Sequence, residues 1–328
     1  MRALALLSDG LDSILAVKLM LDQGIDVVAI NFITPFQISE RKWVHGISKK
    51  FKIPLKTVKL GEDYLKIIVK PKFRYGKHMN PCIDCRIFML KKAKTYAKKI
   101  NASFIVTGEV LGERPMTQTR EALDIIEKET RLRGKILRPL SAKLLPKTEA
   151  EKKGWVDREK LLDIKGRSRK GQIELAKKYR LKKYPSPTGG CLLTYKEFAD
   201  KVRDLIEHKK KIMMKDIPFL KIGRHFRFGK NKIIVGRNED ENKQLLKFKD
   251  ASDYYFEVPS YGSPITLLQG PKTKKAVEKA AALTARYSDS KEKKIVVKFG
   301  RERLDKSVTL SALSNEEIKR LRVGEGKS

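Results

Sequence analysis

Short apolar runs alternate with helix-period patterns over the first part of the chain. The predicted strands are residues 3–7, 27–32, 55–60, 104–106 and 135–137. The predicted helices between them are residues 14–23, 39–51, 62–69, 83–100 and 116–130. Continuous apolar strands joined by helices are typical of a doubly wound parallel α/β sheet, which binds its ligands beyond the carboxyl ends of the strands.

The pattern changes after residues 209–216, which we predict to be a linker. Short strands are predicted at residues 225–228, 232–235, 253–258, 265–268 and 295–299, with a helix at 273–287. The sequence therefore predicts an α/β domain at residues 1–208 and a smaller α+β domain at 217–328. Before the linker, two predicted capping boxes mark helix starts, Thr148 with Glu151 and Thr194 with Glu197.

Residues 8–13, between the first strand and the first helix, have the composition of a phosphate-binding turn. Gly10 allows close approach, Ser8 and Ser13 supply hydroxyl groups, and the amino end of the helix favours an anion. Asp12 can cap the helix or hold Mg²⁺. An ordinary capped turn explains the same residues, so the loop by itself indicates only a candidate site.

Two other segments follow predicted strands and are expected to face the same crevice as this loop. One is Asn31 with Phe32, and the other runs from Gly108 through Gln118 to Thr119. We therefore predict a single ligand site built from three strand ends.

The chain is strongly basic. It has 74 Lys and Arg against 39 Asp and Glu, a formal net charge of +35, and a mean hydropathy of -0.45. An excess this large indicates a polyanionic partner, with nucleic acid as the first candidate. No apolar run reaches the ~20 residues of a membrane-spanning helix, and the first residues lack a signal-peptide pattern. We expect a cytoplasmic protein that does not bind membranes.

Basic side chains gather in two places, and both are predicted to contact RNA. In the basic segment 165–183 the predicted contacts are Arg167, Arg169 and Lys170, for which a solvated helix face is the alternative. In the C-terminal domain they are Arg224, Arg227, Arg237, Asn238 and Asn242. A plain β-turn at residues 236–238 is the alternative there.

Three cysteines are the most informative chemical feature. Cys82 and Cys85 form Cys-x-x-Cys at a helix start, and Cys191 lies in a Gly-Gly turn that can fold back to them. Three thiolates can hold a [4Fe-4S] cluster whose fourth iron stays open. The alternatives are a zinc site completed by His78 or water, persulfide chemistry on the pair, and three buried apolar side chains. Their turn and helix-start positions favour a site.

These motifs together resemble a known family. Ser8-Asp-Gly-Leu-Asp-Ser13 resembles the Ser-Gly-Gly-x-Asp-Ser loop of the PP-loop ATP pyrophosphatases, which have a HUP-like α/β fold. Residues 107–119, followed by Leu137-Arg-Pro-Leu140, resemble the second nucleotide-side segment of the 4-thiouridine synthetases. Asn80-Pro-Cys-Ile-Asp-Cys85 with Cys191 is similar to the three-cysteine arrangement of iron–sulfur-dependent tRNA thiolation enzymes. Residues 234–242 resemble the NFACT-R RNA-binding module.

The resemblance implies an ATP-dependent tRNA uridine thiolase that forms 4-thiouridine. Adenylate is transferred to a uracil carbonyl oxygen with release of pyrophosphate, and sulfur carried by the cluster then displaces AMP. The implied cofactors are ATP, Mg²⁺ held by Asp12, and a [4Fe-4S] cluster on the cysteines. Gln118 and Thr119 contact the nucleotide or the uracil, with helix capping as their alternative role. The implied partners are tRNA and either inorganic sulfide or a sulfur-donor protein.

Three alternatives to this function stay open. They are a 2-thiouridine synthetase, another PP-loop ligase or amidotransferase with structural zinc, and a non-catalytic RNA-binding protein. One departure from the family pattern bears on them, because Asp9 stands where the family has the first glycine of its loop. Its side chain points outward, binds Mg²⁺ or weakens ATP use. The family's N-terminal RNA-binding extension is also not seen here, so we expect the C-terminal module to bind RNA.

Overall fold

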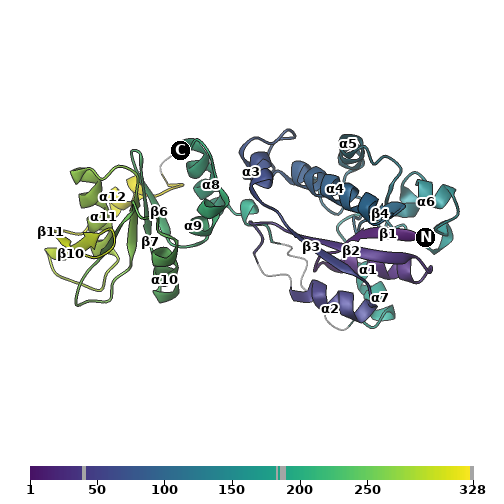
Figure 1. The fold of residues 1–328 in the computed structure, drawn as a ribbon, viewed down its shortest axis with the longest axis horizontal. Coiled ribbons are helices and arrows are strands. Elements are labelled where there is room, and N and C mark those ends of the chain that lie inside the picture. Colours follow the sequence, from purple (N-terminus) through teal and green to yellow (C-terminus); the bar gives the residue numbers. More distant parts are fainter. Residues whose placement is uncertain (39–41, 182–183, 185–189, 326–328) are drawn as a thin grey trace. The chain divides into compact units, whose positions relative to one another are not determined.

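The computed structural model describes residues 1–38, 42–181, 184 and 190–325. They form two compact units, Met1–Thr194 and Tyr195–Ser328 (Figure 1). This boundary lies before α8 (Lys196–His208), upstream of the linker predicted at 209–216. Helix α8 belongs to the second unit because Asp204 on it accepts hydrogen bonds from Arg227 at 2.7 and 2.8 Å. The predicted turn before Cys191 includes residues 185–189, which lie outside the described residues.

Unit 1 is built on a five-stranded parallel sheet in the order β3-β2-β1-β4-β5. The strands are β1 (Arg2–Leu6), β2 (Asp26–Ile33), β3 (Leu55–Lys59), β4 (Phe104–Val106) and β5 (Ile136–Leu137). Ala5 pairs with Ala29 on one side and with Val106 on the other. The predicted doubly wound sheet is therefore confirmed. Its strand order reverses between β1 and β4, and such a switch point is where open α/β sheets bind ligands.

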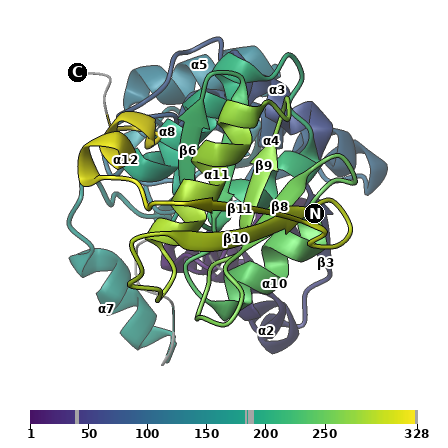
Figure 2. The same ribbon diagram turned by 90° about the vertical axis from the view of Figure 1, so that its left-hand side faces the viewer.

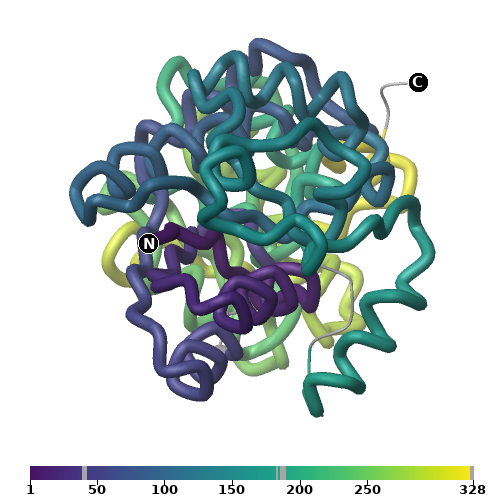
Figure 3. Tube along the Cα trace, turned by 90° about the vertical axis from the view of Figure 1, so that its right-hand side faces the viewer, coloured from purple at the N-terminus to yellow at the C-terminus, as the bar shows by residue number. Residues whose placement is uncertain are grey.

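The first five helices of unit 1 agree with the predicted ranges except at a few ends, and no ranges were predicted for the last two. The predicted helix start at 39–41 lies outside the described residues. They are α1 (Leu11–Leu21), α2 (Lys42–Phe51), α3 (Glu62–Val69), α4 (Cys82–Lys99), α5 (Arg120–Thr130), α6 (Glu149–Lys152) and α7 (Lys170–Lys178). Helix α5 begins after Thr119 rather than at Met116, because the Thr119 hydroxyl caps it. The capping box of Thr148 and Glu151 is confirmed at α6. Figure 3 follows this trace, with the purple N-terminal segment among blue and teal segments.

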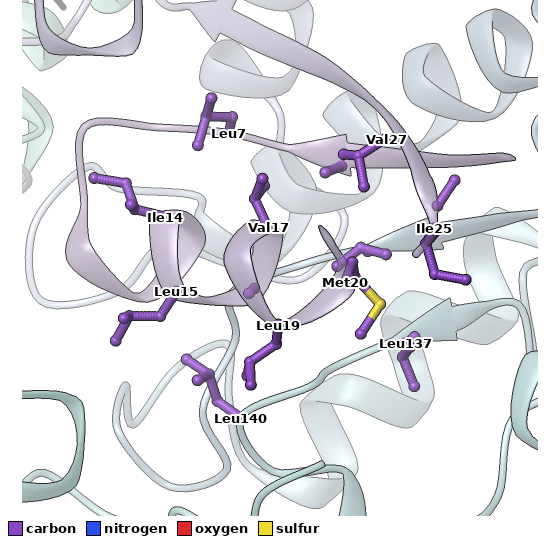
Figure 4. Close-up of a cluster of buried hydrophobic side chains, with 14 of the residues drawn as sticks. Leu7, Ile14, Leu15, Val17, Leu19, Met20, Ile25, Val27, Leu137 and Leu140 are labelled. Carbon is purple, nitrogen blue, oxygen red and sulfur yellow. The ribbon is translucent and has the colours of Figure 1, made fainter. Parts of the chain in front are cut away.

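Helix α1 is buried on almost every side, which explains its low amphipathicity. Ile14, Leu15, Val17 and Met20 are at most 1% exposed, and Figure 4 shows them packed with side chains from the strands and from Leu137 and Leu140. Ala176 and Leu181, on and after α7, join the same core. A helix that is apolar all round is enclosed by its neighbours, so the sheet and α7 together fix the loop that precedes α1.

Unit 2 contains a six-stranded antiparallel sheet in the order β11-β10-β8-β9-β7-β6 (Figure 2). The strands are β6 (Arg224–Phe228), β7 (Asn231–Val235), β8 (Tyr254–Glu257), β9 (Thr266–Gln269), β10 (Ile295–Gly300) and β11 (Lys306–Leu310). The helices are α8, α9 (Ile217–Lys221), α10 (Glu239–Phe248), α11 (Lys274–Arg286) and α12 (Asn315–Leu321). Sequence reasoning missed β11, α9, α10 and α12. It also predicted a Thr194 capping box that is not observed, because α8 begins after Tyr195 and the Thr194 hydroxyl donates to Cys191 O.

Both faces of the unit 2 sheet are covered by helices. Ile233 and Val235 of β7 pack in a core with the small residues of α11, while Ile234 packs on the opposite face with Leu245 of α10. This alternation follows from the two-residue period of a strand. Across the described ranges, none of the helices combines the length and hydrophobicity that a membrane crossing requires.

Candidate functional site

The loop at residues 8–13 is closed by its own side chains. Ser13 Oγ accepts the Ser8 N–H at 3.0 Å and lies 2.9 Å from the Gly10 carbonyl oxygen, and Ser8 Oγ accepts the Gly10 N–H at 3.2 Å. Ser13 is only 7% exposed, whereas Gly10 is exposed. Ser13 therefore shapes the loop from inside, and Ser8 and Gly10 lie nearer its surface at the amino end of α1, where an anion is favoured.

Asn31, near the end of β2, supports this loop, and Phe32 lies buried beside it in the chain. Asn31 Nδ2 donates to the Leu7 carbonyl oxygen at 2.8 Å, and Asn31 and Phe32 are 2% and 3% exposed. Asn31 thus fixes the end of β1, where the loop begins. Contact of either residue with a nucleotide stays a prediction, and both residues are buried.

Asp9 interacts with the amino end of a different helix. Its Oδ1 accepts the Val44 N–H at 2.9 Å, and Val44 is the third residue of α2. The first amides of a helix have no partner within the helix, and a carboxylate near them is favourable. The geometry supports a capping role for Asp9, so its charge is directed at α2.

We expect Asp9→Ala to lower the free energy of unfolding by about 1 kcal/mol, since a helix cap is lost. Asp9→Asn should cost less, because its amide oxygen can accept the same hydrogen bond. Urea unfolding followed by tryptophan fluorescence measures this in unit 1, because Trp43 and Trp155 both lie there. Equal stability of the alanine variant and the natural protein would show that the cap contributes nothing.

Gly108 lies against the backbone of the first turn of α1. A Cβ atom at this position would lie 2.4 Å from Ser13 N and 2.5 Å from the carbonyl carbon of Asp12. Only glycine permits so close an approach of two backbones. The loops after β1 and β4 therefore meet at the switch point of the sheet.

Gln118 and Thr119 shape the turn that follows Gly108. Gln118 Oε1 accepts the Arg114 N–H at 3.1 Å, and its backbone oxygen accepts the Gly112 N–H at 2.7 Å. The Thr119 hydroxyl accepts the Ala122 N–H at 3.2 Å. Helix capping is thus confirmed for Thr119, and contact of either residue with the nucleotide or uracil stays a prediction.

Sequence reasoning missed a buried network of charges next to Gly108. Glu109 is 1% exposed, and its carboxylate oxygens lie 2.9 Å from Arg86 Nε and 3.0 Å from Arg138 Nε. Arg138 also pairs with Glu127 of α5. Burial acts to raise the pKa of Glu109, but Arg86 and Arg138 outweigh it and hold the pKa below its usual value. Because Arg86 follows Cys85 on α4, the network joins the cysteine helix to the switch point.

The three cysteines lie close enough to influence one another. Asn80 Nδ2 donates to Cys82 Sγ at 3.3 Å, and the Tyr64 hydroxyl lies 3.1 Å from Cys85 Sγ. Burial raises the pKa of the Cys191 thiol to about 12, and Cys85 and Cys82 add to the rise. In the part of the chain that the structure describes, no three His, Cys, Asp or Glu side chains converge on one metal-ion position.

Backbone hydrogen bonds bring Cys191 back to the start of α4. Leu192 N donates to Phe36 O at 2.8 Å and Ile38 N to Gly190 O at 3.1 Å, so the segment pairs with the chain after β2. Met79 N donates to Leu193 O at 3.2 Å, just ahead of Cys82. This pairing was not readable from the sequence, which offered only the Gly-Gly turn as a signal.

Asp12 lies in the first turn of α1, but it does not cap the helix. The cap residue is Gly10, without a side-chain hydrogen bond, and Asp12 Oδ1 is buried with no hydrogen-bond partner. Burial raises the pKa of Asp12, and Arg169, whose Nη2 lies 3.9 Å from Oδ1, is the main opposing influence. Arg169 was predicted to contact RNA, whereas the structure places it at the loop. Arg167 and Lys170 are exposed, and RNA contact by them stays a prediction.

The arginines predicted to bind RNA in unit 2 have partners within the unit. Arg227 forms a two-pronged ion pair with Asp204, and Arg237 Nε lies 2.9 Å from Glu241 Oε1. Arg224 stacks on the Tyr287 ring at 4.6 Å. These contacts show structural roles, and RNA binding by the three arginines stays a prediction.

Asn238 and Asn242 have structural roles as well. Asn238 caps α10 by accepting the Glu241 N–H at 3.0 Å, so a helix start rather than a plain β-turn follows Gly236. Asn242 Oδ1 accepts the Ile265 N–H at 2.9 Å. Both side chains organise unit 2, and their contact with RNA is likewise a prediction.

Two parts of the chain match known protein families. Residues 1–147 match the family model described as Thiamine biosynthesis protein (ThiI), and residues 223–322 match the NFACT protein RNA binding domain. Both matches confirm the predicted resemblances.

Curated relatives and solved structures match as well. A probable tRNA sulfurtransferase of Thermococcus kodakarensis is 31% identical over 148 residues, covering 42% of this chain and 36% of the relative. One from Methanocaldococcus jannaschii is 32% identical over 143 residues, with the same coverage. The chain thus spans about a third of the length of these relatives.

A 4-thiouridine synthetase–RNA complex with bound ATP shares 25% identity at a TM-score of 0.36, over 67% of this chain and 52% of that one. The U34-tRNA thiolase NcsA from Methanococcus maripaludis, with its [4Fe-4S] cluster, shares 18% at a TM-score of 0.35, over 63% and 67%. Both TM-scores are low, so the fold assignment depends on the strand order and the family models.

Proposed function

We propose that this chain, whose residues 1–147 match the ThiI family model, is an ATP-dependent tRNA uridine thiolase that forms 4-thiouridine. The observation that carries the proposal is the buried link between two halves of one site. Glu109, next to Gly108 at the switch point, pairs with Arg86, next to Cys85 at the start of α4. The ion pair thereby connects the segment that contacts the loop at residues 8–13 to the helix start that carries Cys82 and Cys85.

The loop after β1 is suited to bind the phosphates of ATP. The Gly10 amide, the Ser8 hydroxyl and the amino end of α1 favour an anion there. The unpartnered Asp12 Oδ1 is a fitting ligand for Mg²⁺, which prefers one or two carboxylates together with substrate phosphates. Bound Mg²⁺ would neutralise phosphate charge during adenylation of the uracil oxygen, and adenylation makes that oxygen a good leaving group.

The cysteines fit a [4Fe-4S] cluster. Each thiolate of such a cluster binds a different iron, so three cysteines need not converge on a single metal position. A bound cluster with three thiolate ligands would offer an open iron to hold sulfide. Asn80 and Tyr64 orient the Cys82 and Cys85 sulfur atoms through their hydrogen bonds. The buried aromatic side chains of Tyr64 and Phe36 limit water at the cysteines.

Mass spectrometry of tRNA nucleosides from cells with and without the gene tests this function. Loss of 4-thiouridine in cells that lack the gene supports the proposal, and loss of 2-thiouridine instead would replace it by the alternative product. Unchanged thiolated nucleosides would contradict it. Metal analysis after anaerobic purification separates the remaining alternatives. A cluster would give about four iron and four sulfide per chain, and a ligase with structural zinc would give zinc. A non-catalytic protein would contain neither metal and would not bind ATP. Cys82→Ser should remove the iron.

A cationic cluster around Tyr254 is the surface of unit 2 that we propose for RNA. Lys272, Arg301 and Lys306 place their charges 5.5, 5.6 and 5.4 Å from the centre of the Tyr254 ring. The cations come from three segments, after β9, after β10 and at the start of β11 (Figure 2). An aromatic ring among cations can stack a base while the cations bind phosphates.

Replacing Arg301 and Lys306 together by alanine is expected to weaken tRNA binding several-fold. The slope of log affinity against log salt should fall by about one for each phosphate that the variant no longer neutralises. Lys243→Ala is the matched control, because Lys243 is exposed and already paired with Glu239. Filter binding at several salt concentrations measures both, and the same slope for the double variant as for the control would contradict the assignment.

A further inference from the structure

Four polar side chains from three segments lie together beside the loop at residues 8–13. They are Asp12 of α1, Glu113 of the turn after Gly108, and Arg169 and Gln172 at the start of α7. Each has buried atoms without a hydrogen-bond partner: Asp12 Oδ1, Glu113 Oε2, Arg169 Nε and both polar atoms of the Gln172 side chain. Buried polar groups are normally paired, so several unpaired ones in one place indicate a missing ligand.

The start of α7 is held beside Glu113 by the backbone. Gly166 N donates to Leu111 O at 2.7 Å, and Leu111 forms a parallel bridge with Lys165. Ser141 connects the two segments, since its hydroxyl donates to Ile164 O at 2.6 Å and accepts the Leu111 N–H at 2.9 Å. Arg169 and Gln172 are therefore positioned by the same loop that carries Glu113.

Packing of α7 on α1 fixes the direction of Gln172. Gln172 and Ala176 are 0% and 1% exposed, and residues four apart lie on one face of a helix. Ala176 belongs to the core that surrounds α1, so Gln172 faces α1 as well. Further along, the Lys18 ammonium of α1 lies 5.2 Å from the centre of the Tyr179 ring. The fold therefore buries the Gln172 amide beside Asp12, whose pKa it acts to lower.

The four side chains combine two kinds of binding group. Carboxylates suit a divalent cation, whereas a guanidinium and an amide suit phosphate oxygens. Two carboxylates beside a phosphate site would repel the ligand unless a cation lay between them. A magnesium-bound polyphosphate satisfies all four groups at once.

We propose that Arg169 and Gln172 of α7 bind the pyrophosphate portion of ATP, together with a divalent cation held by Asp12 and Glu113. This inference deepens the proposed function and rests on it. Before adenylation the two α7 side chains hold the β- and γ-phosphates, and afterwards they hold the released pyrophosphate. The basic segment that contains α7 is thus divided, because Arg169 serves the nucleotide while the exposed Arg167 and Lys170 are available to RNA.

Calorimetric titration with magnesium pyrophosphate and, separately, with AMP tests the inference. Gln172→Leu and Arg169→Met should each weaken pyrophosphate binding about tenfold or more and leave AMP affinity unchanged. Lys177→Met, at an exposed position of α7, is the matched control and should change neither. Gln172→Leu should also keep or raise the melting temperature, because it removes an unpaired buried amide at similar volume.

Each outcome bears on the inference. Unchanged pyrophosphate affinity in both variants, or an equal loss for AMP and pyrophosphate, would overturn it. A natural protein that binds no magnesium pyrophosphate would overturn it as well. Thiolation of tRNA by the natural protein is measured in parallel: thiolation with unaffected variants refutes only the role of α7, whereas pyrophosphate binding without thiolation refutes only the proposed function.

Discussion

Gly108→Ala is expected to destabilise unit 1 by about 1–3 kcal/mol, the usual cost of forcing extra atoms into a packed site. ATP affinity should fall at least about tenfold, which corresponds to about 1.4 kcal/mol. The reason is geometric, because the added Cβ would lie 2.4 Å from Ser13 N and 2.6 Å from its Cα. Backbone atoms cannot swing aside as a flexible side chain can. The loop at residues 8–13 must therefore move, and its phosphate-binding amides move with it.

Gly46→Ala is the matched control for this substitution. Gly46 lies within α2, and a Cβ there would have no atom within 4 Å. Alanine in a helix interior is favoured over glycine by about 1 kcal/mol, so the control should be neutral or stabilising. Fluorescence-detected urea unfolding and ATP titration measure both variants. Normal ATP affinity in Gly108→Ala would separate ATP binding from the contact between the two loops.

Glu109→Gln is expected to lower the free energy of unfolding by about 3–5 kcal/mol, as removal of one member of a buried ion pair does. The glutamine has nearly the same shape but leaves Arg138, which is 4% exposed, with Glu127 as its one remaining counter-charge among the residues that the structure describes. Arg86, which lies on α4, loses its carboxylate partner as well. Because the network joins α4 to the switch point, iron content and ATP affinity should fall together.

Glu159→Gln controls for the loss of a negative charge in this basic protein. The Glu159 side chain is 84% exposed and pairs with Lys143 at 3.1 Å. Exposed ion pairs contribute about 0–1 kcal/mol, so this variant should unfold almost as the natural protein does. If the free energy of unfolding fell no more in Glu109→Gln than in Glu159→Gln, the buried network would not stabilise the site.

The local sequence pattern alone was enough to predict most of the helices and strands. The sheet of unit 1 was predictable because buried parallel strands are continuous apolar runs, and helices with the right period separate them. The loop at residues 8–13 and the Cys82 and Cys85 pair were visible as short motifs. Helix α10 was missed because half of its ten residues are charged. Strand β11 was missed because it is short and has only Val308 and Leu310 as apolar residues.

The same limit explains why the sequence did not reveal the partners of several site residues. Arg169 belongs to a basic run that indicates a polyanion, but the sequence cannot distinguish the triphosphate of a nucleotide from the backbone of RNA. Arg227 and Arg237 were expected to face RNA, and each has a carboxylate partner on a helix, Asp204 of α8 and Glu241 of α10. The charge of a side chain is known from its residue type, but its interaction partner is determined by the fold.

The sequence by itself determined the strand–loop–helix unit, the doubly wound sheet and the three cysteines, because each depends on neighbouring residues or on a short period. Tertiary structure alone decided the partners across long separations: Asp9 with α2, Glu109 with Arg86 and Arg138, and Gln172 with Asp12. These partners depend on how buried surfaces pack, and burial is what makes an unpaired charge or amide costly. The loop at residues 8–13 was therefore recognisable from the sequence, whereas the groups that surround its ligand were decided by the fold.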